Sequence, residues 1–419
     1  MNRLDGFERG RGLTRRRGVL TAVLGAAALG LVTFAPPAVD RAAAEDPIKI
    51  GELNSYNRFA AFSVPYRHGF ELAFEEINAA GGVLGRQIEV ISRDDGATTG
   101  DAVRVAEELV SRENVDFIFG TFLSNIGLAV ADFANQRKTL FLAAEPLTDA
   151  LTMGAGNRYT YRIRPNTHMQ TAMLVEAAKD LGAKRWAIVV PNYEYGQAAA
   201  ANFKKLAPEA MEGIEIVVEQ YPALGKIDAG ATISAIEQAK PDAIFSALFG
   251  GDLAKFVREG TTRGLFENRT VLSLLTGEPE WLLPLADEAP EGWIVTGYPW
   301  DEVEGERHQA FVDAYQAKVN DTPRLGSLLG YQMGYLIKAM LEKAGSTDTE
   351  AMLAALEDLE FDGIVGPAVM RGIDNQATIG IWVGKITNEG GKGKMVDFVY
   401  KDGADYMFPE EEVSAPRSD

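Results

Sequence analysis

Ile48-Lys49-Ile50-Gly51-Glu52-Leu53 and the later stretch Ile88-Glu89-Val90-Ile91-Ser92-Arg93-Asp94 frame the segment that decides the fold. Both stretches are rich in β-branched residues, which favours strands. Between them Gly81-Gly82 ends a segment in which apolar residues recur at helical spacing: Phe70, Ala73, Phe74, Ile77 and Ala80. A strand, a helix and a second strand in this order are typical of a parallel sheet covered by helices. The sequence therefore predicts an α/β fold.

The same alternation continues along the chain in two successive series. The first series continues with a helix face at 102–109 and strands at 115–120 and 140–143. The second begins near Pro165, with helices expected at 169–181, 197–206 and 233–239 and strands at 186–191, 214–221 and 243–248. A strand near 293–298 and helices near 309–319 and 328–344 are too few for a third domain. We expect these late segments to join the two earlier units.

The first 44 residues differ in character from the rest of the chain. Thr14-Arg15-Arg16-Arg17 precedes an apolar run at 20–35, and Ala42-Ala43-Ala44 supplies the small residues of a cleavage site. This order is typical of a signal peptide cleaved near Ala44. The arginine pair resembles a twin-arginine signal, with an ordinary basic start as the alternative. The run is too rich in Ala and Gly to favour a membrane anchor.

Charge and cysteine content exclude several classes of function. The whole chain carries a formal charge of −19, and residues 45–419 carry −23, from 34 basic and 57 acidic residues. Such a chain is repelled by nucleic acid and by anionic membrane surfaces, so neither is expected as a partner. The sequence has no cysteine, which excludes disulfides, thiolate nucleophiles, cysteine metal sites and a lipid anchor on cysteine. An exported, soluble periplasmic protein is the expectation that remains.

Candidate ligand-binding residues follow two predicted strands. In open α/β sheets, ligands bind at the carboxyl ends of strands, where helix N-termini present free N–H groups. Ser124 opens the helix after the 115–120 strand, and it either caps this helix or binds a ligand carboxylate. Ala143-Ala144-Glu145 follows the next strand and either offers backbone N–H groups to the same anion or is an ordinary loop.

Aromatic residues near predicted strand ends are candidates for the wall of an apolar pocket, although core packing is the commoner role for any single one of them. They are Tyr56, Phe59, Phe62, Tyr195, Phe249 and Tyr331. The three histidines, His68, His168 and His308, have no partner at helical spacing, so no metal site is expected. The chain also has no phosphate loop and no Gly-x-Ser-x-Gly motif. We therefore predict no enzymatic activity and no cofactor.

The stretch from Ile77 to Arg86, Ile-Asn-Ala-Ala-Gly-Gly-Val-Leu-Gly-Arg, resembles the periplasmic binding proteins of the branched-chain amino acid (Leu/Ile/Val-binding) family of ABC transporters. The similarity extends in the family's order over nearly the whole chain after residue 44. Further matching segments are Asp94-Asp95, Gly120 to Ser124, Pro146-Leu147-Thr148, Tyr161 to Pro165, Tyr195-Gly196, Pro241-Asp242-Ala243, Gly330-Tyr331 and Phe361-Asp362-Gly363.

This resemblance implies the type I periplasmic binding fold, in which two Rossmann-like lobes are joined by three hinge crossings and hold a ligand between them. The crossings are expected near Arg164, Tyr298 and Arg371. The expected N-terminal lobe comprises 48–164 and 299–371, and the C-terminal lobe comprises 165–298 and 372–405. Residues 406–419 are expected to form a tail.

The resemblance also assigns roles to individual residues. It implies that Ser124 and the backbone of Ala143 and Ala144 bind a ligand carboxylate, and that Tyr195 contacts the ligand from the second lobe. It places Phe62 at the pocket mouth and Tyr331 on a further wall, and it makes Glu278 the acid that pairs with a ligand ammonium group.

The chain departs from the family pattern at two loops. Ala143-Ala144-Glu145 is one residue shorter than the family's loop, and Asn54 to Arg58 differs from the common Pro-Leu-Thr-Gly. If Arg58 or Glu145 faces the cleft, either changes the ligand preference, for instance toward an aromatic acid.

The function implied by the resemblance is that of a monomeric, periplasmic ligand-binding subunit of an ABC importer. The ligand is expected to be an amino acid or a related small carboxylate, delivered to a permease in the inner membrane. Two alternatives stay open: a sensor with the same fold that signals to a membrane receptor, and a binder of an aromatic acid or amide.

Overall fold

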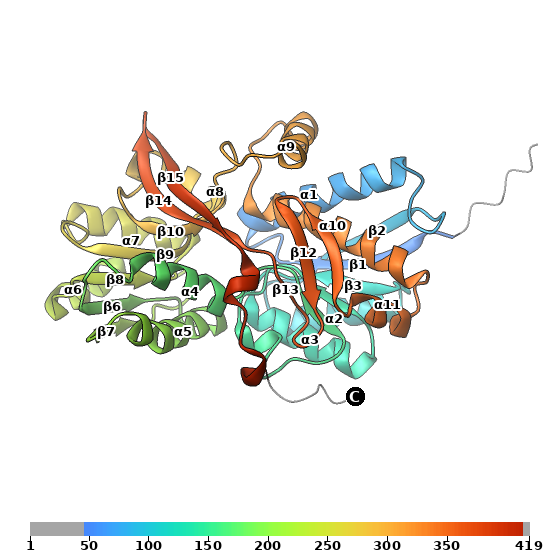
Figure 1. Ribbon diagram of the computed structural model, residues 1–419, viewed down its shortest axis with the longest axis horizontal. Helices are drawn as coiled ribbons and strands as arrows, with labels where there is room; N and C mark the ends of the chain where they lie inside the picture. Colours follow the sequence, from blue (N-terminus) through green and yellow to red (C-terminus); the bar gives the residue numbers. More distant parts are fainter. Residues whose placement is uncertain (1–45, 414–419) are drawn as a thin grey trace, which may run out of the picture. The chain divides into compact units, whose positions relative to one another are not determined.

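The computed structural model describes residues 46–413, and these residues form two sheets, each covered by helices (Figure 1). The predicted signal peptide, its cleavage site near Ala44 and the last six residues of the predicted tail lie outside the described residues. Within the described part of the chain, no helix is long and apolar enough to cross a membrane.

The first sheet has eight strands in the order β11-β12-β13-β5-β4-β3-β1-β2. Neighbouring strands from β13 to β2 pair in parallel. Strand β12 pairs antiparallel with both of its neighbours, β11 and β13. The strands are β1 (Ile48–Asn54), β2 (Ile88–Asp94), β3 (Phe117–Gly120), β4 (Phe141–Ala143), β5 (Thr160–Arg162), β11 (Leu359–Gly363), β12 (Gly366–Arg371) and β13 (Gln376–Ala377).

Helices cover both faces of this first sheet because the strands are apolar on both sides. In β1, Ile48 and Ile50 belong to the core on the α1 side, whereas Leu53 belongs to the core on the side of α2 and α3. The helices of this lobe are α1 (Ala60–Ala79), α2 (Thr99–Ser111), α3 (Ser124–Arg137), α9 (Glu306–Val319), α10 (Leu325–Ala344) and α11 (Thr349–Leu356), with a 3-10 turn η1 (Asp149–Leu151).

Helices α1 and α10 pack closely because glycines lie at their contact. A Cβ atom at Gly330 would lie 2.1 Å from the carbonyl oxygen of Tyr66, so only glycine fits there. The close packing of α10 on α1 places a segment from late in the chain beside the first sheet.

The second sheet has seven strands in the order β15-β14-β10-β9-β8-β6-β7. Its strands are β6 (Arg185–Val189), β7 (Glu215–Gln220), β8 (Ala243–Ser246), β9 (Thr270–Gly277), β10 (Ile294–Gly297), β14 (Ile381–Glu389) and β15 (Lys392–Lys401). The accompanying helices are α4 (Thr167–Ala178), α5 (Glu194–Ala210), α6 (Ala229–Ala239), α7 (Gly250–Thr262) and α8 (Pro279–Leu282), with a 3-10 segment η2 (Leu283–Glu288). Strand β14 pairs antiparallel with β10, so a C-terminal hairpin completes a sheet built from the middle of the chain.

The chain passes between the two sheets three times: from β5 to α4, from β10 to α9 and from β13 to β14. The first two passages follow Arg162 and Gly297, close to the expected positions at Arg164 and Tyr298. Because β13 pairs with β5 and β12 in the first sheet, the third passage follows Ala377 and not Arg371. Residues 372–377, expected in the second lobe, therefore lie in the first.

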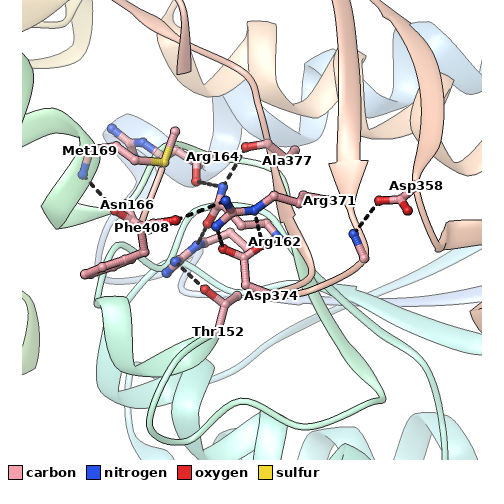
Figure 2. A network of polar contacts seen from close by, with 12 residues as sticks. Thr152, Arg162, Arg164, Asn166, Met169, Asp358, Arg371, Asp374, Ala377 and Phe408 are labelled. Atoms are coloured by element: carbon pink, nitrogen blue, oxygen red, sulfur yellow. Dashed lines mark hydrogen bonds and ion pairs between the residues drawn. The ribbon is translucent and has the colours of Figure 1, made fainter. Parts of the chain in front are cut away.

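A polar network that includes Arg162, Arg164 and Asp374 lies beside the first and third passages (Figure 2). Within it, the side-chain amide of Gln376 connects the two passages. The Gln376 oxygen accepts a hydrogen bond of 2.6 Å from Arg162 Nε, and its amide nitrogen donates to the carbonyl oxygen of Arg164 at 3.0 Å. All three residues are buried. Two segments that are more than 200 residues apart in sequence are thus held in one polar network at the hinge.

The segment after β15 packs on the protein up to residue 413, although a tail was expected from 406. It contains two 3-10 turns, η3 (Gly403–Tyr406) and η4 (Glu410–Glu412). The Phe408 ring stacks on His168 of α4, with centroids 3.9 Å apart. Arg371 Nη1 donates to the Phe408 carbonyl oxygen at 3.0 Å, so this segment contacts both lobes.

Candidate functional site

A small enclosed cavity lies where carboxyl ends of strands from both sheets meet. Its free volume is about 10 Å³, roughly what one water molecule requires. Any larger solute therefore enters only when the surrounding side chains or the lobes move apart. Its lining residues are Phe62, Phe122, Ser124, Glu145, Leu147, Arg164, Tyr193, Tyr195, Phe249, Leu275, Glu278 and Trp281.

Aromatic rings from both lobes form most of the cavity wall. Phe62 of α1 lies 4.9 Å from Phe122 and 6.2 Å from Trp281 of α8, measured between ring centroids. Phe249, which precedes α7, lies 5.5 Å from Trp281 and 6.1 Å from Tyr195. These separations are in the range of favourable aromatic pairs. Rings from both lobes thus give the cavity a largely aromatic wall.

Ser124 is the first residue of α3 and not its cap, which is Leu123. Its Oγ accepts hydrogen bonds from the backbone N–H groups of Leu147 (3.1 Å) and Thr148 (3.2 Å). A hydroxyl has two acceptor sites and one donor, so the remaining capacity of Ser124 is its O–H. The side chain fixes the loop after β4 and presents a donor to the cavity.

The backbone of Ala143 and Ala144 is engaged in the sheet. The Ala144 N–H donates to the carbonyl oxygen of Gly120 at 3.0 Å, and the Ala143 carbonyl accepts from the N–H of Ile163 at 3.1 Å. Neither alanine lines the cavity. The expected carboxylate-binding role of the Ala144 amide is therefore not available in this arrangement.

Arg164 and Glu278 form an ion pair that is buried at the cavity, with side chains 1% and 0% exposed. Glu278 also accepts from the Trp281 indole N–H at 3.0 Å, and the Arg164 guanidinium lies 5.1 Å from the Phe62 ring centre. Burial raises the pKa of Glu278, and the Arg164 charge opposes this rise. The acid expected to bind a ligand ammonium group is thus already paired within the protein.

Glu145 lines the same cavity and is 1% exposed. Neither of its carboxyl oxygens has a hydrogen-bond partner. Burial raises the pKa of Glu145 well above its usual value; the Arg164 charge opposes this rise, and the Glu52 carboxylate adds to it. A buried carboxyl without a partner is costly, which marks Glu145 as a group poised for a ligand.

Helix α8 carries a second buried acid onto the first lobe. Glu280 Oε1 accepts from the Gly326 N–H at 2.6 Å, at the N-terminus of α10. A carboxylate is stabilised there by the free N–H groups and the helix dipole. The short helix that supplies Trp281 to the cavity is thus docked on the first lobe next to the site.

The structure brings together Phe62, Ser124, Glu145, Tyr195, Phe249 and Glu278 from the expected set. Tyr56 and Tyr331 lie elsewhere. The Arg67 guanidinium lies 3.7 Å from the centre of the Tyr56 ring. Tyr331 donates to Glu76 Oε2 of α1 at 2.5 Å. Arg58 is exposed and borders a neighbouring depression that shares Phe249 and Trp281 with the cavity.

Sequence reasoning missed several lining residues, above all Arg164, Phe122, Tyr193 and Trp281. Phe122 and Trp281 each directly follow or lie close to a strand end, so the rule that selected Ser124 also applies to them. Arg164 was noted only as a crossing. Among residues 46–413, no group of three His, Asp or Glu side chains is arranged to bind a metal ion.

Two α/β lobes joined by three passages, with an aromatic-lined cavity between the strand ends, define the type I periplasmic binding fold. A family model described as periplasmic binding protein matches residues 47–393, and the chain belongs to this family.

Known relatives agree with this membership. The Leu/Ile/Val-binding protein homolog 7 of Brucella suis is 27% identical over 340 residues, covering 77% of this chain and 83% of the relative. The Leu-, Ile-, Val-, Thr- and Ala-binding protein of Pseudomonas aeruginosa is 27% identical over 304 residues, covering 72% and 79%.

A solved structure has the same fold. It is the solute-binding protein of an ABC transporter from Rhodopseudomonas palustris BisB5, in complex with 3,4-dihydroxybenzoic acid. It superposes with a TM-score of 0.77 at 23% identity, and the match covers 85% of this chain and 98% of that chain. The chain is therefore a periplasmic binding protein. This confirms the predicted fold class and a binding function rather than an enzymatic one.

Proposed function

We propose that this protein captures a small organic carboxylate with an apolar or aromatic body and delivers it to the permease of an ABC importer. Export by the predicted signal peptide, with cleavage near Ala44, and action as a monomer belong to the same proposal. The observation that carries it is the enclosed cavity, in which aromatic rings from both lobes surround a few polar groups.

Two donors suit a ligand carboxylate. The Ser124 hydroxyl has only its O–H left to offer, because its oxygen already accepts two backbone N–H groups. Arg164 lines the cavity, and its Nε has no hydrogen-bond partner although Glu278 occupies another nitrogen. Both residues belong to the first lobe or its hinge, so a carboxylate would bind there before the second-lobe rings close over the ligand.

The relatives support this class without narrowing it to one compound. One is named for binding leucine, isoleucine, valine, threonine and alanine, and the solved structure contains 3,4-dihydroxybenzoic acid. These compounds share a carboxylate and a largely apolar body, which are the two features that the cavity matches.

A thermal-shift screen tests the proposal, because a ligand that binds the native state raises its melting temperature. The panel comprises the common amino acids, benzoate and its hydroxylated derivatives, and aliphatic carboxylates. We expect at least one carboxylate to raise the melting temperature, with calorimetry giving 1:1 binding. Tyr331→Phe, outside the cavity, should bind the same compound equally well. If only compounds without a carboxylate bind, the proposal fails.

A further inference from the structure

The cavity contains one acid that the protein itself does not neutralise. Apart from tyrosines, its ionisable lining groups are Glu145, Arg164 and Glu278. Arg164 and Glu278 neutralise each other in a buried ion pair. Glu145 is equally buried, and neither of its oxygens accepts a hydrogen bond.

We propose that Glu145 binds a positively charged nitrogen of the ligand, so that the solute is an amino acid or another amino-carboxylate rather than a simple carboxylic acid. This inference rests on the proposed function and narrows its ligand class. It assigns the ammonium group to a first-lobe acid, because the second-lobe acid Glu278 is held by Arg164 and Trp281.

The loop that carries Glu145 is rigid enough to select a ligand. Immediately after it, Pro146 and Thr148 accept hydrogen bonds from Arg162 through their carbonyl oxygens, and Ser124 binds the Leu147 and Thr148 N–H groups. A binding group discriminates well when its own backbone is fixed in this way. The position of the carboxyl group relative to Ser124 is therefore set before any ligand arrives.

The surroundings of Glu145 favour a cation over a second anion. Besides the guanidinium of Arg164, which is paired with Glu278, the groups that face Glu145 are the side-chain amide of Asn54, the carboxyls of Glu52 and Glu280 and the hydroxyl of Tyr66. The Phe62 and Phe122 rings at the same cavity also present π-faces, which attract a desolvated ammonium group. The ligand carboxylate is instead placed at the Ser124 hydroxyl and Arg164 Nε, the two donors of the same cavity.

Matched pairs of ligands test the inference. L-Leucine and 4-methylpentanoate differ only in the α-ammonium group, as do L-phenylalanine and 3-phenylpropanoate. By calorimetry, we expect the wild-type protein to bind at least one amino acid of these pairs at least about tenfold more tightly than its des-amino partner. In Glu145→Gln this preference should collapse. Glu52 is an equally buried acid outside the cavity, so Glu52→Gln should keep the preference.

The outcomes separate the two proposals. Equal affinity for both members of each pair in the wild-type protein overturns the role of Glu145 and leaves the carboxylate proposal standing. No binding of any amino acid or carboxylate overturns both. Should Glu145→Gln fail to fold, Glu145→Asp decides, because it keeps the carboxyl group but withdraws it by one methylene. The preference for the amino acid should then shrink, and an unchanged preference overturns the inference.

Discussion

The Arg164 guanidinium, at the first passage between the lobes, forms a buried ion pair with Glu278, which follows β9 in the second lobe. The backbone carbonyl of Arg164 is at the same time held by Gln376 of the third passage. One residue thus connects the first and third passages to the wall of the cavity. A change in the relative position of the lobes must alter this pair, because its two members lie in different lobes.

Arg164→Met should destabilise the protein by about 3–5 kcal/mol, since Glu278 would lose its counterion in a buried site. The double variant Arg164→Met/Glu278→Leu should recover a large part of this loss, because an apolar pair replaces two buried charges. Urea unfolding of both single variants and the double variant measures the coupling. Additive effects would show that the two side chains do not depend on each other.

Glu52→Gln should stabilise the protein at neutral and alkaline pH but not at pH 4. Burial raises the pKa of Glu52 from 4.5 to about 8. At any pH where Glu52 is ionised in the unfolded chain, its burial therefore lowers the free energy of unfolding. The cost is absent below pH 4.5, grows as the pH rises, and levels off above pH 8. At pH 7 it amounts to about 3 kcal/mol at most. Melting temperatures at pH 4, 7 and 9 test this; a pH-independent gain would contradict it.

Ser124→Ala should weaken the binding of a carboxylate ligand and also lower stability. The change removes the acceptor of the Leu147 and Thr148 N–H groups, which costs about 1–3 kcal/mol for buried groups left unpaired. Calorimetry with the carboxylate identified by screening, together with urea unfolding, separates the two effects. Loss of stability with unchanged affinity would restrict Ser124 to holding the loop.

The framework of both lobes was predictable because its elements are long and periodic. The expected strand at 88–94 coincides with β2, and the helices expected at 309–319 and 328–344 are α9 and α10. Strand β13 has two residues and therefore no periodicity, which is why the third passage was placed several residues too early. The β14–β15 hairpin was also missed, since its pairing with β10 joins segments about 90 residues apart.

The cavity was predictable where residues follow a strand directly. Ser124 and Glu145 were found from their places after β3 and β4, and the structure puts both at the cavity. That Glu278 would already be paired could not be foreseen. Its partner Arg164 is 114 residues away, and nothing local in either segment indicates that they meet. Likewise, only the tertiary structure shows that the Ala144 N–H is used by Gly120.

Gln376 and Gln332 form a matched pair of buried amides with opposite expected effects. Gln376→Met removes the partners of Arg162 Nε and of the Arg164 carbonyl at the hinge, and it should cost about 1–3 kcal/mol. Gln332 is also buried, but neither its oxygen nor its nitrogen has a hydrogen-bond partner, so Gln332→Met should be neutral or stabilising. Urea unfolding compares the two variants. Because the Gln376 amide joins the first and third passages, Gln376→Met should also change ligand affinity. Gln332→Met should leave affinity unchanged. If the two variants behave alike, the amide at residue 376 does not connect the passages energetically.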